Sequence, residues 1–254
     1  MIRKYLKSNA VGLLLAGSTA LSAQAFDLSA MTEAEEVEFG EAVRAYLLEN
    51  PEVIMEAVAI LQEREAQQEV ARDVDLVAGN LDALHNDGFS WQGGNPDGDI
   101  TIVEFLDYRC GYCKRAHPEV ASLLAEDGNI RLIVKEYPIL GEESVLASRF
   151  AIAVKQLHGD DAYKLAQDAL MAMRGNVNEA SLTRIAGEFG HDMAAIATQM
   201  NSEDVSDVIR DTRLLGQRMQ ISGTPSFVIG DHLLRGFLPQ AGMQEIIADQ
   251  RDNG

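Results

Sequence analysis

The two cysteines of this chain lie close together, where an apolar segment gives way to a helical one. Cys110 and Cys113 are separated by two residues and come shortly after the apolar run from Ile100 to Leu106. The run predicts a buried strand over 100–108, and residues 111 to about 125 have the pattern of a helix. The pair is therefore expected at a strand–helix junction, with Cys110 at the N-terminus of the helix.

The segments that follow alternate between strand and helix patterns. The pattern predicts a strand over 130–137, a helical tract over about 142–220 that is broken at 159–160, 175–176 and 190–191, a hairpin of strands 226–229 and 233–236, and a closing helix over 240–250. Strand, helix, strand, helical insert, hairpin and helix make an α/β plan with a helical subdomain set into it.

The residues before this region are helical in pattern. Thr32 followed by Glu35 predicts a capping box, and the segment 50–52, Asn-Pro-Glu, predicts the end of one helix and the start of the next. Turn residues on either side predict a short strand over 89–92.

The second predicted helix carries two apolar stripes separated by a polar middle. One stripe contains Ile54, Val58 and Leu61; the other lies between 70 and 84, and the residues 62–69 between them have almost nothing to bury. This favours an arm whose two ends have different contacts, one with the α/β domain and the other with a sister subunit. Alternatively, both stripes pack on the chain's own domain.

The first 25 residues read as a secretory signal. Arg3, Lys4 and Lys7 form a basic start, an apolar centre follows over 11–16, and 23–25 is a small-residue cleavage site that ends at Ala25. The centre is short for a membrane span, which needs about 20 apolar residues. We therefore expect export to the periplasm, where a cysteine pair can be oxidised and recycled.

The composition is strongly acidic. The net charge is −19, and removal of the three signal-peptide cations would make it about −22. Such a charge argues against nucleic acid or anionic lipid as a partner, and its simplest role is to keep an exported protein soluble.

The spacing of the cysteines favours reactivity over structural support. A disulfide that closes about four residues stabilises by roughly 2 kcal/mol, whereas one that closes about a hundred gives nearly 5. A helix N-terminus favours the anionic thiolate, so Cys110 is expected to be the nucleophile and the more shielded Cys113 the resolving thiol. The intervening Gly111 and Tyr112 supply no cation, which predicts an oxidant of intermediate strength. The flanking Arg109 and Lys114 would lower the pKa of Cys110 somewhat.

Three other interpretations of the pair stay open at this point. It could be a structural disulfide, it could bind copper or zinc together with His117, or it could be a chance occurrence in an unrelated fold. The metal interpretation lacks a second cysteine pair to complete the four-ligand shell of structural zinc.

Two further motifs bear on the choice among these interpretations of the cysteine pair. Pro118 follows Cys113 by five residues, and Gly223-Thr224-Pro225 comes directly before a predicted strand. With the CxxC pair, these motifs make residues 99–250 resemble the thioredoxin superfamily, and the order of elements resembles its DsbA-like branch of exported thiol-disulfide oxidoreductases.

The resemblance implies a thioredoxin fold and further site residues. Pro225 matches the family's cis-proline, against which an extended substrate pairs with the backbone at Thr224; Tyr112 is expected to contact substrate as well. Glu104 matches a buried acid that exchanges a proton with Cys113. The alternatives are an ordinary trans-proline and a glutamate at the strand's exposed face.

The N-terminal segment is similar to the helical leader of ScsC-like proteins, some of which oligomerise through it. The expected organisation is a signal over 1–25, an arm over 26–85 that could form a homo-oligomer, and a catalytic domain over 86–254. The expected function is formation or shuffling of disulfides in unfolded or misfolded exported proteins, with a membrane redox partner and no cofactor. A disulfide reductase, or a copper-handling or chaperone module, is the alternative.

Overall fold

The computed structural model describes residues 31–253, so the predicted signal over 1–25 lies outside the described residues. The chain divides into two compact units, one that ends at Leu61 and one that begins at Gln62. Between residues 31 and 253, no helix combines the length and the apolar character needed to cross a membrane.

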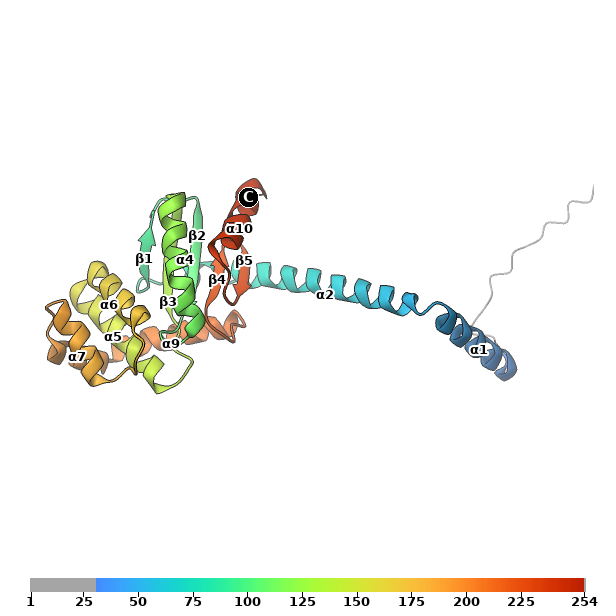
Figure 1. Cartoon of the computed structure of the whole chain (residues 1–254), viewed down its shortest axis with the longest axis horizontal. Helices are drawn as coiled ribbons and strands as arrows, with labels where there is room; N and C mark the ends of the chain where they lie inside the picture. Colours follow the sequence, from blue (N-terminus) through green and yellow to red (C-terminus); the bar gives the residue numbers. More distant parts are fainter. Residues whose placement is uncertain (1–30, 254) are drawn as a thin grey trace, which may run out of the picture. The chain divides into compact units, whose positions relative to one another are not determined.

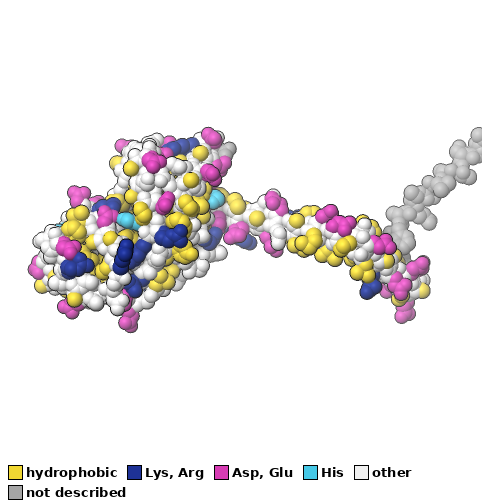
Figure 2. Space-filling model, viewed as in Figure 1, with side chains coloured by type: hydrophobic (Ala, Val, Ile, Leu, Met, Phe, Trp, Pro, Cys, Tyr) yellow, Lys and Arg dark blue, Asp and Glu magenta, His cyan; other side chains and the backbone are white. Residues whose placement is uncertain are grey.

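Two helices begin the described chain, as the sequence predicts. Helix α1 covers Glu33–Glu49, and α2 covers Glu52–Ala78. The Thr32 hydroxyl accepts a hydrogen bond from the Glu35 backbone, and the Glu35 side chain accepts one from the Thr32 backbone, which confirms the capping box. In Figure 2, hydrophobic side chains are exposed along the first half of α2.

The second unit is built around a five-stranded sheet in the order β1-β3-β2-β4-β5 (Figure 1). The strands are β1 Trp91–Gly94, β2 Ile100–Leu106, β3 Ile130–Glu136, β4 Ser226–Ile229 and β5 His232–Arg235. Strands β2 and β3 are parallel and the other pairs antiparallel. The α/β class is therefore confirmed, with β2 at the centre of the sheet.

Helices cover both faces of this sheet. They are α3 Leu81–His85, α4 Gly111–Asp127, α5 Glu142–His158, α6 Asp160–Ala172, α7 Glu179–Glu188, α8 Met193–Met200, α9 Glu203–Arg218 and α10 Gln240–Asn253. One face, which includes Ile102 and Val134, packs on α4, α10 and the helical insert. The other, which includes Val103 and Phe105, packs on the end of α2, on α3 and on the end of α9.

The predicted boundaries differ from the observed ones at several points. Strand β1 begins at Trp91 rather than at Phe89, because the backbone N–H groups of Phe89 and Ser90 donate to the Asp87 side chain and form a turn. Strand β2 ends at Leu106 rather than at 108. The helical tract has one break that the sequence reading missed, at 201–202, where the Ser202 hydroxyl caps α9.

Candidate active site

Cys110 lies at the N-cap of helix α4, as predicted. Its sulfur accepts a hydrogen bond from the backbone N–H of Cys113 at 3.4 Å and therefore performs the role that an oxygen has in ordinary capping residues. The residue is 7% exposed whereas Cys113 is fully buried, so Cys110 is the more exposed of the two cysteines, as expected.

The surroundings of Cys110 favour the thiolate. Its pKa is lowered to about 5, and the largest cause is the hydrogen bond from the Cys113 thiol. Desolvation acts to raise the pKa, but the side chain of Thr224 and backbone N–H groups at the start of the helix lower it further. These hydrogen bonds, rather than the flanking cations, are the leading causes of the low pKa.

Cys113 has the opposite character. It is fully buried, and its sulfur accepts a long hydrogen bond of 3.5 Å from the backbone N–H of Asp107. Burial raises its pKa well above the usual value, and the neighbouring Cys110 and Glu104 raise it further. Both cysteines carry free thiols, so the site combines a stabilised thiolate with a thiol that holds its proton.

A loop from the far end of the chain closes over Cys110. The peptide bond between Thr224 and Pro225 is cis, as the family resemblance implied. The Sγ atom of Cys110 lies 3.0 Å from the carbonyl oxygen of Thr224 across 114 positions of sequence. The loop therefore forms a wall of the candidate site directly beside the Cys110 sulfur.

Glu104 lies in the middle of β2 and is 1% exposed, which excludes a position on an exposed face of the strand. Desolvation raises its pKa to about 8, and the charge of Glu136 adds to this effect. Its Oε1 atom is buried with no hydrogen-bond partner. At neutral pH, Glu104 is therefore mainly protonated.

The cationic side chains next to the cysteines are directed toward the helical insert. The Arg109 guanidinium lies 3.1 Å from the Glu143 carboxylate and donates to the Gly175 carbonyl, and the Lys114 ammonium donates to the Met173 carbonyl. These contacts join the active-site turn to the insert, which is a positional role that the sequence reading did not anticipate.

The third candidate ligand of the metal interpretation contacts a carboxylate. This ligand, His117, has its Nε2 atom 2.7 Å from the Asp168 carboxylate. In the part of the chain that the structure describes, no group of three or more His, Cys, Asp and Glu side chains is arranged to hold a metal ion.

Tyr112 is exposed over 57% of its surface. Its ring lies beside Phe237, with 6.3 Å between centroids, and the Arg115 guanidinium lies over both rings. The sequence reading missed Phe237 and Arg115, because only folding brings the segment after β5 to the start of α4. The three side chains form an aromatic and cationic surface next to Cys110.

A buried cluster beneath the site also escaped the sequence reading. Glu136, at the end of β3, accepts hydrogen bonds from the hydroxyls of Tyr108 and Tyr163, both at 2.6 Å. A glutamate at the end of a strand whose middle, 132–134, is apolar was a signal available in the sequence. Its two partners could not be found without the fold, since Tyr163 comes from the helical insert.

Together, the strand–helix junction with its polarised thiols and the cis-proline loop define the DsbA-like thiol-disulfide oxidoreductases of the thioredoxin superfamily. The chain matches the DSBA-like thioredoxin domain over residues 101–248. It belongs to that family. Residues 35–68 match a second family, the copper resistance protein ScsC N-terminal domain.

Solved structures and curated proteins agree with this assignment. A thioredoxin-like oxidoreductase from Silicibacter pomeroyi is 41% identical, with a TM-score of 0.64, over 68% of this chain and 98% of its own. A linker-deletion variant of Proteus mirabilis ScsC is 26% identical, with a TM-score of 0.66, over 90% of this chain and 100% of its own.

Two kinds of curated protein are also similar to the chain. Disulfide bond formation protein D of Bacillus subtilis is 22% identical over 61% of this chain and 73% of its own. The Na(+)/H(+) antiporter NhaA 3 of Salinispora tropica is 25% identical over 136 residues, which are 54% of this chain but only 21% of the antiporter. The chain thus spans about a fifth of the length of that relative.

Proposed function

We propose that this protein is an exported oxidoreductase that forms or shuffles disulfides in periplasmic proteins through Cys110 and Cys113. The observation that carries the proposal is the opposite character of the two thiols, because the pKa of Cys110 is lowered to about 5 while that of Cys113 is raised. The Cys110 thiolate is thus both a good nucleophile and a good leaving group, whereas Cys113 must lose its proton before it can react.

In the oxidising direction, the enzyme starts with a disulfide between Cys110 and Cys113. A substrate thiolate attacks the Cys110 sulfur, the Cys110–Cys113 bond breaks, and Cys113 leaves with the electron pair and takes up a proton. A second substrate thiolate then displaces Cys110 as a thiolate. The substrate loses two electrons and the cysteine pair gains them, and a membrane redox partner would remove them again.

In the shuffling direction, the enzyme starts reduced. The Cys110 thiolate attacks a substrate disulfide and forms a mixed disulfide, from which another substrate thiol releases it with no net electron transfer. The cis-proline loop suits either direction, since the backbone at Thr224 lies beside the sulfur where an extended substrate segment would pair. The exposed Tyr112 would contact the same segment.

The periplasm is proposed as the location because residues 1–25 read as a secretory signal and because a disulfide donor needs an oxidising compartment. The substrates proposed are unfolded or misfolded exported proteins. Their extended segments offer free backbone groups and accessible cysteines, which folded proteins bury.

A trapping experiment tests the reaction. Replacing Cys113 with Ser removes the resolving thiol, so mixed disulfides between Cys110 and substrate proteins should accumulate and be visible on non-reducing gels of periplasmic extracts. The matched control is Cys110→Ser, which should trap nothing. If Cys113→Ser traps nothing and keeps full activity, the cysteines bind a ligand rather than react, as a copper-handling or chaperone module would require.

The net direction of electron flow is tested by the reduction potential together with refolding of a scrambled multi-disulfide protein. A pKa near 5 for Cys110 lies between the values of about 7 for thioredoxin and about 3.5 for DsbA, which predicts an intermediate potential. A potential as low as that of thioredoxin, about −270 mV, would instead identify a reductase.

A further inference from the structure

Glu136 lies on the same face of the sheet as Glu104. Strands β2 and β3 are parallel, with Glu104 opposite Val134 and Leu106 opposite Glu136. Because side chains alternate between faces, Glu104, Leu106, Val134 and Glu136 all face α4 and the helical insert. The two carboxyl groups are therefore diagonal neighbours on adjacent strands, both fully or almost fully buried.

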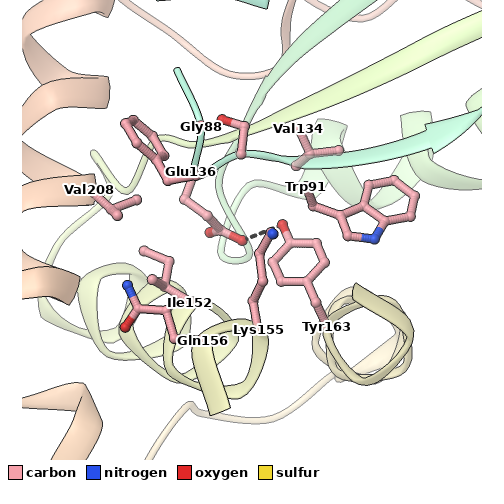
Figure 3. A pocket seen from close by; sticks show the side chains of 11 residues that line it. Gly88, Trp91, Val134, Glu136, Ile152, Lys155, Gln156, Tyr163 and Val208 are labelled. Atoms are coloured by element: carbon pink, nitrogen blue, oxygen red, sulfur yellow. Dashed lines mark hydrogen bonds between the residues drawn. The ribbon is translucent and has the colours of Figure 1, made fainter. Parts of the chain in front are cut away.

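Glu136 also borders a pocket of about 240 Å³ between β1, β3 and the helical insert. Figure 3 shows its carboxyl group next to the Tyr163 hydroxyl, and Lys155 lines the same pocket. One carboxyl oxygen, Oε1, accepts from both tyrosines; the other, Oε2, is buried with no hydrogen-bond partner. Glu136 is thus a buried acid that borders this pocket, whereas Glu104 is not among the residues that line it.

The charged and titratable neighbours of Glu136 come from each element around it. Glu104 lies in β2, and Asp107 and Tyr108 come directly after that strand. Lys155 comes from α5, and its ammonium group pairs with Asp160 at 2.7 Å. Tyr163 comes from α6. Helix α9 contributes only the apolar Val208. Burial raises the pKa of Glu136 to about 7, although Tyr108, Tyr163 and Ser148 act to lower it.

We propose that Glu136 is a positioning residue for Glu104: its carboxylate, held by Tyr108 and Tyr163, keeps Glu104 protonated and so sets the pH at which Cys113 becomes able to resolve a mixed disulfide. The inference rests on the proposed function of the cysteine pair. Glu136 ionises first because two tyrosine hydroxyls stabilise its charge, and that charge opposes a second one on Glu104.

The step that Glu136 controls is a proton transfer without a change in electron count. Before Cys113 attacks the mixed disulfide, its thiol proton passes to the Glu104 carboxylate. The Cys113 sulfur then bonds to Cys110, the bond from Cys110 to the substrate sulfur breaks, and the substrate leaves as a thiolate. The step is slow as long as Glu104 keeps its own proton.

Rapid mixing of the reduced full-length protein with Ellman's reagent tests the inference. The first release of coloured thiolate reports attack by Cys110, and the second reports resolution by Cys113. With Glu136→Gln, we expect the pH midpoint of the second release to fall by about half to one unit and its rate at pH 7 to rise about threefold to tenfold. The midpoint of the first release should move much less.

A gentler variant and a matched control accompany this test. Tyr163→Phe removes one hydrogen bond to Glu136 while preserving shape, so Glu136 keeps its proton to higher pH and the second midpoint should again fall, by a smaller amount. Tyr137→Phe removes a buried hydroxyl that donates to the Ile221 carbonyl. Tyr137 packs on the other face of the sheet from Glu104 and Glu136, so this change should leave the midpoint of the second release unchanged.

The outcomes separate this inference from the proposed function. If the wild type shows no second release, the proposed function fails. If the second release occurs but its midpoint is unchanged or rises in both Glu136→Gln and Tyr163→Phe, only the role of Glu136 fails. The role also fails if Glu136→Gln produces the same shift when Glu104 is already replaced by Gln, because the effect would then not pass through Glu104.

Discussion

At the scale of single residues, the two cysteines differ because of their hydrogen bonds and burial rather than because of nearby cations. Cys110 receives hydrogen bonds from the start of α4 and from Cys113, whereas Cys113 lies inside the core. Since the pKa of Cys110 is lower when folded than when unfolded, its contribution to the stability of the reduced protein is full above about pH 8.5 and is lost as the pH falls toward 5.

Thr224→Val tests the contribution of the cis-proline loop to this thiolate. The Thr224 hydroxyl is buried without a hydrogen-bond partner in the reduced protein and acts to lower the pKa of Cys110, so its removal should raise that pKa, by about half to one unit. Ultraviolet absorbance of the thiolate, titrated in the reduced protein, measures the change. Thr212→Val, which removes a buried hydroxyl from α9, is the control and should leave the titration midpoint in place.

At the scale of elements, the close approach of α9 to the end of β3 connects the helical insert to the sheet. A Cβ atom on Gly216 of α9 would lie 2.4 Å from the Tyr137 ring. That ring is held by an edge-on contact with Phe105 and by its hydrogen bond to the Ile221 carbonyl, so it has little freedom to move away. A glycine is therefore needed at this point of the helix.

Gly216→Ala should accordingly destabilise the protein, by about 1–3 kcal/mol from overpacking, despite the better helix propensity of alanine. The matched control is Gly187→Ala in α7, where an added Cβ meets nothing within 4 Å. That change should be neutral or stabilise by up to about 1 kcal/mol. Urea unfolding measures both; equal effects of the two substitutions would contradict the packing argument.

At the scale of the whole molecule, the first unit leaves apolar side chains exposed. Ile54 is 52% exposed and Leu61 is 56% exposed, and α1 buries no residue. Exposed apolar residues in a stripe indicate an interaction surface. With the match of residues 35–68 to the ScsC N-terminal domain, they support the proposal that residues 26–85 join copies of this chain.

Light scattering of the purified protein tests that proposal. Replacing Ile54, Val58 and Leu61 together by Gln should reduce the mass in solution to that of one chain, because each buried aliphatic side chain contributes about 1.5–3 kcal/mol to an interface. The control replaces three glutamates of the same helix, Glu56, Glu63 and Glu65, by Gln and should keep the oligomer. A wild-type protein that is monomeric at all concentrations would contradict the proposal.

The sequence by itself determined the parts of this protein that depend on local pattern. The runs around β2 and β3 predicted their strands because most of their residues are apolar, and the change from a strand pattern to a helix pattern placed Cys110 at a helix start. The Thr32 capping box follows from contacts over three residues and was also readable in advance. The cis bond at Pro225 came from family resemblance, since no local rule demands it.

Only the tertiary structure decided how these parts meet. The carbonyl of Thr224 reaches Cys110 across 114 positions, and Tyr163 reaches Glu136 across 27. Glu104 is buried because helices cover both faces of β2, and its neighbour Glu136 is set by the register of β2 with β3. The physical reason is that a pKa is set by burial and by charges within a few ångströms, and both are properties of the packed core.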